Sequence, residues 1–128
     1  MKHPLFKHID DVQWTAALPQ VRDGRSLAIH LKVLDRSEGR LVSYTRYDPG
    51  YVVPLHSHGG DEVIYILDGD VTIGDVHCTP GMAIMLNKGT PIGPIVAGSQ
   101  GTRLLEVFIG KDAGKPIFAA DATDRRPQ

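Results

Sequence analysis

The chain has 128 residues, a formal net charge of −1 and 41% hydrophobic residues. This length is that of one domain, and the apolar fraction is sufficient to bury a core. The 14 basic residues are offset by 15 acidic ones, so the chain has no excess positive charge for a phosphate backbone and nucleic acid is not expected as a partner.

No apolar run approaches the roughly 18 residues that a membrane-spanning helix needs. The N-terminal residues also lack the continuous apolar stretch of a signal peptide. The single Cys78 cannot form a disulfide within the chain. We therefore expect a cytoplasmic protein with no membrane attachment.

Glycine and proline divide the chain into short segments that are rich in Val, Ile, Leu, Tyr and Thr, a composition typical of β-strands. In chain order the predicted strands are 27–34, 40–47, 51–55, 62–67, 70–73, 83–86, 92–96 and 102–109. Among the predicted turns between them are 68–69 and 98–101, and no segment has a helical period. Short strands at this regular spacing predict an all-β sandwich or closed barrel.

The strand pattern divides the chain into a barrel of residues 26–110 with a segment on each side. The N-terminal segment, residues 1–25, contains Trp14 and Leu18, which predict an added strand on the barrel or on a second subunit. The polar C-terminal tail, residues 111–128, is expected to pack loosely.

Two histidines and a glutamate form the most informative pattern. His56 and His58 are two residues apart, so on a strand both imidazoles project from one face. Gly59 and Gly60 let the chain turn with no side chain to obstruct a neighbour, and Glu62 then opens the next strand and can turn back to the same point. Two imidazoles and a carboxylate on one side of a metal form the facial triad, which leaves coordination positions open. A His-x-His pair alone would more often be a polar rim, but the glutamate and the flanking glycines favour one divalent metal ion per chain.

This segment resembles the first motif of the cupin superfamily, G-x5-H-x-H-x3-E-x6-G. Its fixed positions are occupied by Gly50, His56, His58, Glu62 and Gly69. The resemblance covers about half of the chain firmly and implies a single-domain jelly-roll β-barrel. It also implies that the two histidines and the glutamate hold iron, manganese, nickel, copper or zinc, of which iron is our preferred expectation.

The second cupin motif, G-x5-P-x-G-x2-H-x3-N, is only partly present. Gly81 and Gly89 match its glycines, whereas Asn87, Ile92 and Val96 stand at the Pro, His and Asn positions. In the family that histidine is usually a further metal ligand, and an alkyl side chain has no lone pair to replace it. The site therefore has three protein ligands, unless another side chain substitutes. The intact first motif favours a working triad over a site that has lost its metal.

The strand that Glu62 opens predicts the pocket wall. Ile64 and Ile66 share the parity of Glu62, so they are expected to line the pocket together with Ile92. The alternate apolar side chains within residues 63–67 point the other way. A strand that is apolar on both faces is typical of one that packs on both sides, so we expect a homodimer.

Tyr44 and Arg46 are catalytic candidates because they share one face of a strand next to the metal motif. If that face is inward, Arg46 can hold a substrate carboxylate through paired hydrogen bonds and Tyr44 can donate a proton or a hydrogen bond. If it is outward, both are surface groups. Ser43, Thr45 and Tyr47 make an equally plausible inner face.

Glu106 is a third catalytic candidate, since it is a lone carboxylate in an apolar strand. It is expected to support the metal or to exchange protons, and the alternative is a surface pair with Arg103. His30 lies within a strand and is able to replace the missing ligand, although such a histidine is more often a surface or core residue. His77 is expected on the outside of the barrel. Cys78 has no neighbour in sequence that would lower the pKa of its thiol, so it is not predicted as a nucleophile.

The predicted function is dioxygen-dependent oxidation of a small organic molecule that chelates the metal, such as a diketone, a phenolic ketone or a thiol acid. The resemblance leaves two alternatives open. One is an isomerase, lyase or decarboxylase in which the metal acts as a Lewis acid. The other is a non-catalytic cupin that binds a metal or a small ligand. The fold does not decide among them, because one scaffold hosts many chemistries.

Overall fold

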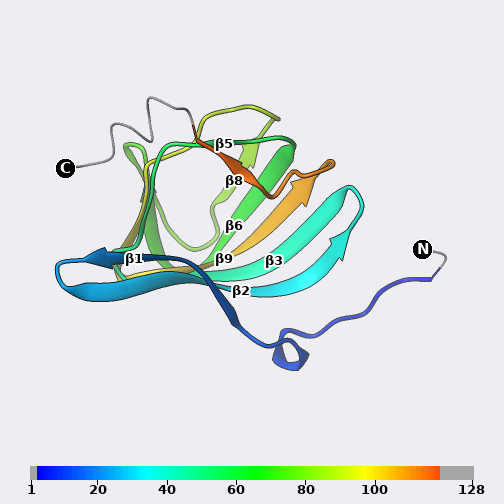
Figure 1. Cartoon of the computed structure of the whole chain (residues 1–128), viewed down its shortest axis with the longest axis horizontal. Coiled ribbons are helices and arrows are strands. Elements are labelled where there is room, and N and C mark those ends of the chain that lie inside the picture. Colours follow the sequence, from blue (N-terminus) through cyan, green and yellow to red (C-terminus); the bar gives the residue numbers. More distant parts are fainter. Residues whose placement is uncertain (1–2, 119–128) are drawn as a thin grey trace.

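A computed structural model describes residues 3–118 of the chain and is built almost entirely of β-strands (Figure 1). In chain order the elements are the 3-10 helix η1 (Ile9–Asp11) and the strands β1 (Thr15–Arg22), β2 (Arg25–Ser37), β3 (Arg40–Tyr47), β4 (Val52–Val53), β5 (Ser57–His58), β6 (Asp61–Ile73), β7 (Val76–Cys78), β8 (Ala83–Leu86), β9 (Ile95–Ile109) and β10 (Pro116–Ile117). Within this range no helix has the length and apolar character needed to cross a membrane.

The strands form one large antiparallel sheet with the order β1-β2-β3-β9-β6-β7, in which β4 also pairs with β9 and β8 with β6. A second, small sheet joins β10 to β5. Figure 1 shows the large sheet curling around a central space, with the small sheet across its upper end. The predicted all-β barrel is therefore confirmed.

The long strands β6 and β9 pair with each other along most of their length. Both continue through segments that we predicted to be turns. The predictions of turns at 68–69 and 98–101 are wrong, because the two strands continue through these residues with shifts of register. Gly69 has a φ of +72°, and a Cβ placed on it would lie 2.1 Å from the carbonyl oxygen of Gly101. Glycine therefore allows a close approach of the two paired backbones at an irregularity in register, and the chain does not reverse here.

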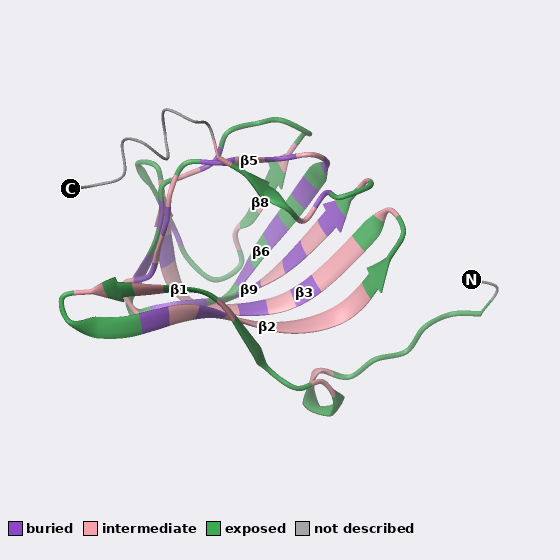
Figure 2. Cartoon of the chain, in the orientation of Figure 1, coloured by how far each residue is buried: buried purple, intermediate pink, exposed green. Residues whose placement is uncertain are grey.

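Burial alternates along β6, as the predicted strand period requires (Figure 2). Ile64 and Ile66 are 3% and 0% exposed, whereas Val63, Tyr65 and Leu67 are 40%, 42% and 41% exposed. The inner side chains join the barrel core, to which β2, β4 and β9 also contribute. The predicted inner and outer faces of this strand are confirmed.

The N-terminal segment adds β1 to the edge of the sheet, antiparallel to β2 of the same chain. Trp14, just before this strand, packs on Tyr44 with ring centroids 5.6 Å apart, and the Lys32 ammonium lies 5.0 Å from the indole centroid. This contact covers part of the outer face of β2 and β3. The division of the chain at residues 25 and 110 stays a prediction.

Candidate metal centre

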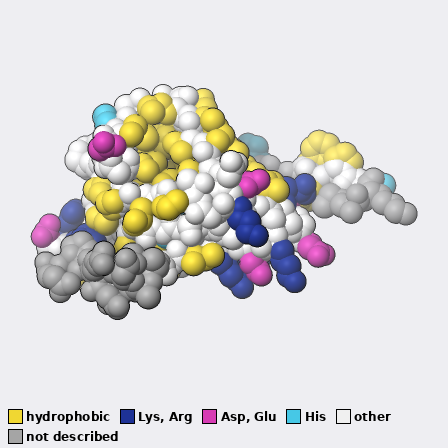
Figure 3. Space-filling view, turned by 90° about the horizontal axis from the view of Figure 1, so that it is seen from above, with side chains coloured by type: hydrophobic (Ala, Val, Ile, Leu, Met, Phe, Trp, Pro, Cys, Tyr) yellow, Lys and Arg dark blue, Asp and Glu magenta, His cyan; other side chains and the backbone are white. Residues whose placement is uncertain are grey.

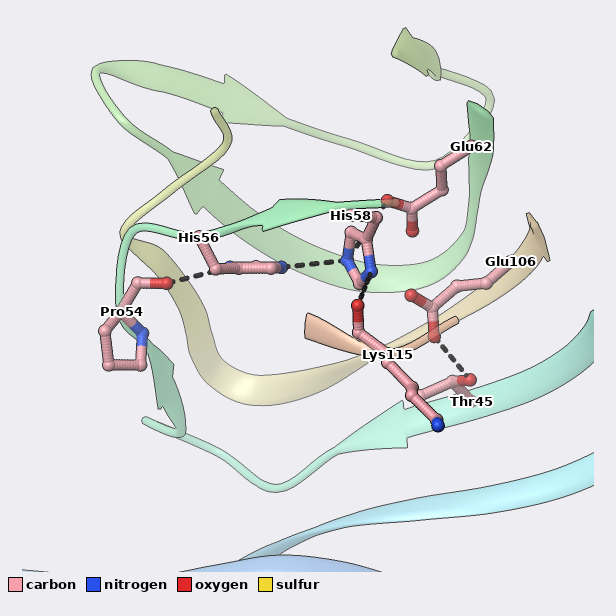
Figure 4. Close-up of polar contacts among 7 residues, drawn as sticks. All are labelled: Thr45, Pro54, His56, His58, Glu62, Glu106 and Lys115. Atoms are coloured by element: carbon pink, nitrogen blue, oxygen red, sulfur yellow. Dashed lines mark hydrogen bonds and ion pairs between the residues drawn. The ribbon is translucent and has the colours of Figure 1, made fainter. Parts of the chain in front are cut away.

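The two motif histidines meet at the end of the barrel that the small sheet covers (Figure 4). His56 pairs with Ile92 through an isolated β-bridge, and His58 lies on β5. The Nδ1 atom of His56 lies 2.8 Å from the carbonyl oxygen of Pro54, and that of His58 lies 3.2 Å from the carbonyl oxygen of Lys115. A carbonyl oxygen only accepts hydrogen bonds, so each Nδ1 carries the proton and each Nε2 keeps a free lone pair.

These two lone pairs face each other. The Nε2 atoms of His56 and His58 are 3.1 Å apart, and the rings meet edge to face at 83°. Burial lowers the pKa of both imidazoles, and for His58 the neighbouring His56 lowers it further. Two neutral nitrogens that both lack a proton cannot hydrogen-bond to each other, so their arrangement fits a shared cation.

Glu62 supplies a buried carboxylate beside this pair. Its Oε1 lies 3.6 Å from Nε2 of His58 and has no hydrogen-bond partner among the described residues. Burial, followed by the charge of Glu106 and a hydrogen bond with it, raises the pKa of Glu62 to about 9. A buried polar atom without a partner costs stability, and a bound cation would remove that cost.

Glu106 also points into the barrel, which settles one alternative. The hydroxyl of Thr45 donates to Oε1 of Glu106 at 2.8 Å, and the Ser43 hydroxyl lies 2.9 Å from that of Thr45. Burial raises the pKa of Glu106, while the hydrogen bonds from Thr45 and Glu62 act in the opposite direction. The alternative of a surface pair with Arg103 is wrong, because Arg103 is exposed and has the opposite parity on β9.

The three motif residues fit a divalent metal, although they do not form a finished cluster. Among residues 3–118, no three His, Cys, Asp or Glu side chains are spaced to hold an ion as they stand. The separation of the two imidazole nitrogens is nevertheless suitable, because two ligands about 2.1 Å from one metal and at right angles to each other lie about 3.0 Å apart. The observed 3.1 Å matches this value.

Tyr44 and Arg46 lie outside the barrel, so their prediction as catalytic residues is corrected. The inner face of β3 carries Ser43, Thr45 and Tyr47, which are 2%, 0% and 5% exposed. Tyr44 contacts Trp14, and Arg46 lies 3.5 Å from a carboxylate oxygen of Asp48 and 6.0 Å from the indole centroid. The hydroxyl side chains of Ser43 and Thr45 lie beside Glu106, whereas Tyr44 and Arg46 pack against Trp14 on the outside.

A cavity of about 460 Å³ leads to the candidate centre. Its wall includes His56, His58 and Glu106, and its apolar part includes Leu31, Val33, Leu41, Val53, Phe108 and Phe118. Figure 3, seen from the side of the small sheet, shows hydrophobic side chains gathered around a hollow, with Lys and Arg side chains to one side. Residues 110–118 form part of the wall, although the sequence predicted only a loosely packed tail.

The prediction that Ile64, Ile66 and Ile92 line the pocket is also corrected. All three point inward, but they belong to the packed core and not to the cavity wall. The cavity instead lies between β2, β3 and the C-terminal residues. Ile92 still occupies the second-motif position, directly across the bridge from His56, with 4% of its surface exposed.

The remaining candidates lie away from the centre. Nε2 of His30 is 3.0 Å from Oδ1 of Asp48, on the same outer face as Trp14, so this histidine does not replace the missing ligand. His77 is exposed and lies 2.8 Å from Asp70. Cys78 is buried, and burial raises the pKa of its thiol.

Comparisons with known proteins agree with this architecture. The family model described as ChrR cupin-like domain matches residues 2–89, and no curated protein matches the sequence. A putative acetylacetone dioxygenase from Methylibium petroleiphilum PM1 has a TM-score of 0.70 at 14% identity, over 92% of this chain and 88% of that chain. The polyketide cyclase RemF from Streptomyces resistomycificus has a TM-score of 0.67 at 20% identity, over 94% and 89%.

A third similar structure comes from a regulatory complex. A chain in the crystal structure of Rhodobacter sphaeroides SigE in complex with the anti-sigma ChrR has a TM-score of 0.59 at 17% identity. The match covers 80% of this chain and 52% of that chain. At these identities the three structures show a shared fold, and the chemistry must be argued from the residues of the site.

Proposed function

This chain belongs to the ChrR cupin-like domain family, and we propose that it is a metal-dependent enzyme that acts on a small organic molecule. The observation that carries the proposal is the position of His56 and His58 in the wall of an open cavity. A structural metal site is closed by its ligands, whereas a catalytic one needs access for a substrate. The family match confirms the resemblance to cupins.

The cavity wall indicates the kind of substrate. A volume of about 460 Å³ is within the range of small-molecule sites. Leu31, Val33 and Phe108 make most of the nearby wall apolar, and Arg36 and Lys111 also border the cavity. A mainly apolar molecule with a metal-chelating group, such as a diketone or a phenolic ketone, suits this arrangement.

The reaction we favour is dioxygen-dependent oxidation of that molecule. Iron, when bound by His56, His58 and Glu62, would supply redox chemistry with dioxygen and a chelating substrate. The chain's own contribution is to fix the two imidazoles through the carbonyl groups of Pro54 and Lys115. The apolar wall excludes water from the reacting molecule. The fold shared with a putative acetylacetone dioxygenase supports this choice.

Metal content tests the proposal directly. The protein is purified without added metal, and its metals are measured by elemental analysis beside His56→Ala, Glu62→Ala and, as a matched control, the exposed His77→Ala. We expect near-stoichiometric iron in the wild type and the control, its loss in the other two variants, and oxygen uptake with a panel of chelating ketones. A wild type that stays metal-free after reconstitution at neutral pH would overturn the proposal. Zinc, nickel or manganese would favour the Lewis-acid alternative.

A non-catalytic role is the second candidate, and the match to a chain in the SigE–ChrR complex favours it. In this role the cavity binds a small ligand or the metal itself and reports it to a partner protein. The two candidates differ in turnover. A ligand that binds with a measurable Kd and is recovered unchanged after prolonged incubation with metal and oxygen indicates a binding module, whereas product formation indicates an enzyme.

The outer face of β6 and β8 supports our proposal of a homodimer. Val63 pairs with Met85 across these strands, and the two side chains are 40% and 68% exposed. Tyr65, on the same face, is 42% exposed. Neighbouring apolar side chains of this kind are often covered by a second subunit. Light scattering should give the mass of a dimer for the wild type and of a monomer for Met85→Glu.

A further inference from the structure

We propose that Glu106 is a fourth protein ligand of the metal and takes over the role that Ile92 cannot perform. This inference rests on the proposed metal centre. Ile92 stands opposite His56, with backbone hydrogen bonds of 2.8 and 3.0 Å in both directions, so the two side chains lie on the same face. The second-motif position is thus well placed for coordination but offers only an alkyl group.

Glu106 is the further buried donor available to the centre. The buried polar or charged residues of the described range are Ser43, Thr45, His56, His58, Glu62, Thr102 and Glu106. After the three motif residues are set aside, Glu106 is the one member of this list with a carboxylate or an imidazole. It also lines the cavity beside His56 and His58.

The register of the sheet brings the two glutamates together. Glu62 pairs with Phe108, and Ile64 pairs with Glu106, so the glutamates are diagonal neighbours on the inner face of β6 and β9. Each carboxyl group influences the pKa of the other, as expected of close neighbours. Figure 4 shows both carboxyl groups turned toward His58.

Charge balance favours a metal held by both carboxylates. Two adjacent carboxylates in a buried site repel each other unless a proton or a cation lies between them. Within residues 3–118, no Lys or Arg forms an ion pair with Glu62 or Glu106. One divalent cation neutralises two carboxylates, whereas in a site with Glu62 alone as its acidic ligand Glu106 would have to keep a proton in order to stay neutral.

Hydrogen bonding already orients Glu106 as a ligand. Thr45 holds one of its oxygens at 2.8 Å, and the Ser43 hydroxyl lies beside that of Thr45. The bond from Thr45 involves Oε1, so the second carboxylate oxygen is not held by Thr45. His56 and His58 are oriented in the same way, each by a hydrogen bond on the side away from the shared space. Such supporting hydrogen bonds are usual for metal ligands.

Two imidazoles and two carboxylates form a harder donor set than the three-histidine-and-one-glutamate site of an intact pair of cupin motifs. It favours Fe²⁺ or Mn²⁺ over Cu⁺, which prefers sulfur ligands. Four protein ligands leave two positions on an octahedral ion. A chelating substrate therefore has room, but three water molecules do not.

Metal affinity and cobalt spectroscopy test this assignment without any activity assay. Metal-free wild type, Glu106→Gln and Thr45→Val are titrated with Mn²⁺ by calorimetry and with Co²⁺ by visible absorption, whose band positions and intensities report the ligands and their number. Circular dichroism checks that each variant is folded. We expect Glu106→Gln to raise the Kd roughly tenfold or more and to change the cobalt spectrum. Thr45→Val keeps the carboxylate and should raise the Kd by roughly tenfold through lost orientation.

A rescue variant sharpens the test. Ile92→His in the Glu106→Gln background restores an imidazole at the second-motif position, so it should recover most of the lost affinity. An unchanged Kd and cobalt spectrum in Glu106→Gln, while the wild type binds metal, would overturn the inference and leave the proposed centre intact. A weaker Kd with an unchanged spectrum would overturn it as well, since Glu106 would then act only by positioning. A wild type that binds neither ion would overturn both this inference and the proposed function.

Discussion

Glu62→Gln should flatten the dependence of stability on pH in the metal-free protein. Glu62 is 3% exposed, and burial, followed by the charge of Glu106, raises its pKa from 4.5 to about 9. Between these values the folded chain keeps a proton that the unfolded chain has lost. The contribution of Glu62 to the free energy of unfolding therefore falls as the pH rises through this window.

The size of the effect follows from the number of protons. One proton changes the free energy of unfolding by about 1.4 kcal/mol per pH unit, so the contribution of Glu62 alone should fall by about 3 kcal/mol between pH 6 and pH 8. Glutamine is similar in shape and does not ionise, so Glu62→Gln should lose less over the same range. Part of the slope should remain, because burial also raises the pKa of Glu106.

Urea unfolding in the presence of a chelator measures this slope, with the fluorescence of Trp14, the one tryptophan of the chain, as the signal. Asp75→Asn is the matched control, since it removes an exposed carboxylate in the turn between β6 and β7. It should leave the slope as it is in the wild type. Equal slopes for Glu62→Gln and the wild type between pH 6 and pH 8 would contradict this expectation, because His56 and His58 titrate in the same way in both proteins.

Three further substitutions test the packing around the site. Ile66→Ala removes most of a side chain that is 0% exposed, so it should lower the free energy of unfolding by about 2–5 kcal/mol in urea titrations. A loss below about 1 kcal/mol would contradict tight packing at this position. Gly60→Ala would place a Cβ 2.1 Å from the carbonyl oxygen of Ile109, so we expect a lower melting temperature and weaker metal uptake, and unchanged values for both would disprove the close approach. Trp14→Ala removes the contact with Tyr44 and should cost about 1 kcal/mol with unchanged metal content, whereas loss of metal would connect this outer contact to the centre.

The alternation of buried and exposed side chains along β6 was predictable, because Glu62 and the isoleucines of its face have one evident position, which is inward. Glu62, Ile64 and Ile66 occupy every second position, and only one arrangement places the carboxylate beside the histidines and the isoleucines in the core. The meeting of the motif residues was predictable for a similar reason, since the three candidate ligands are close in sequence. Local spacing therefore determines their side of the barrel.

The parity of β3 was not predictable, because both of its faces carry polar and aromatic side chains. On the inner face Thr45 donates a hydrogen bond to Glu106, which is distant in sequence, so the pairing could not be read from β3 alone. The turns predicted at 68–69 and 98–101 show a related limit. A glycine with positive φ suits a turn and a bulge equally, and only the neighbouring strand distinguishes the two.

The role of Lys115 in the site also left no trace in the sequence. Its carbonyl oxygen holds the imidazole of His58, and every residue has a carbonyl group. The cavity was equally hidden, since β2, β3 and residues 110–118 meet only in the folded chain. Contacts through backbone atoms, and surfaces built from distant segments, become visible only in the folded structure.

The hydrogen bond from His58 to Lys115 makes the last described strand part of the centre. β10 pairs with β5, so the segment that carries Lys115 is fastened to the segment that carries His58. Thermodynamic linkage works in both directions: a bound ion that fixes His58 also fastens β10, and detachment of β10 loosens the ion. If the proposed centre holds a metal, detachment of β10 would therefore weaken its binding without any change in the proposed ligands.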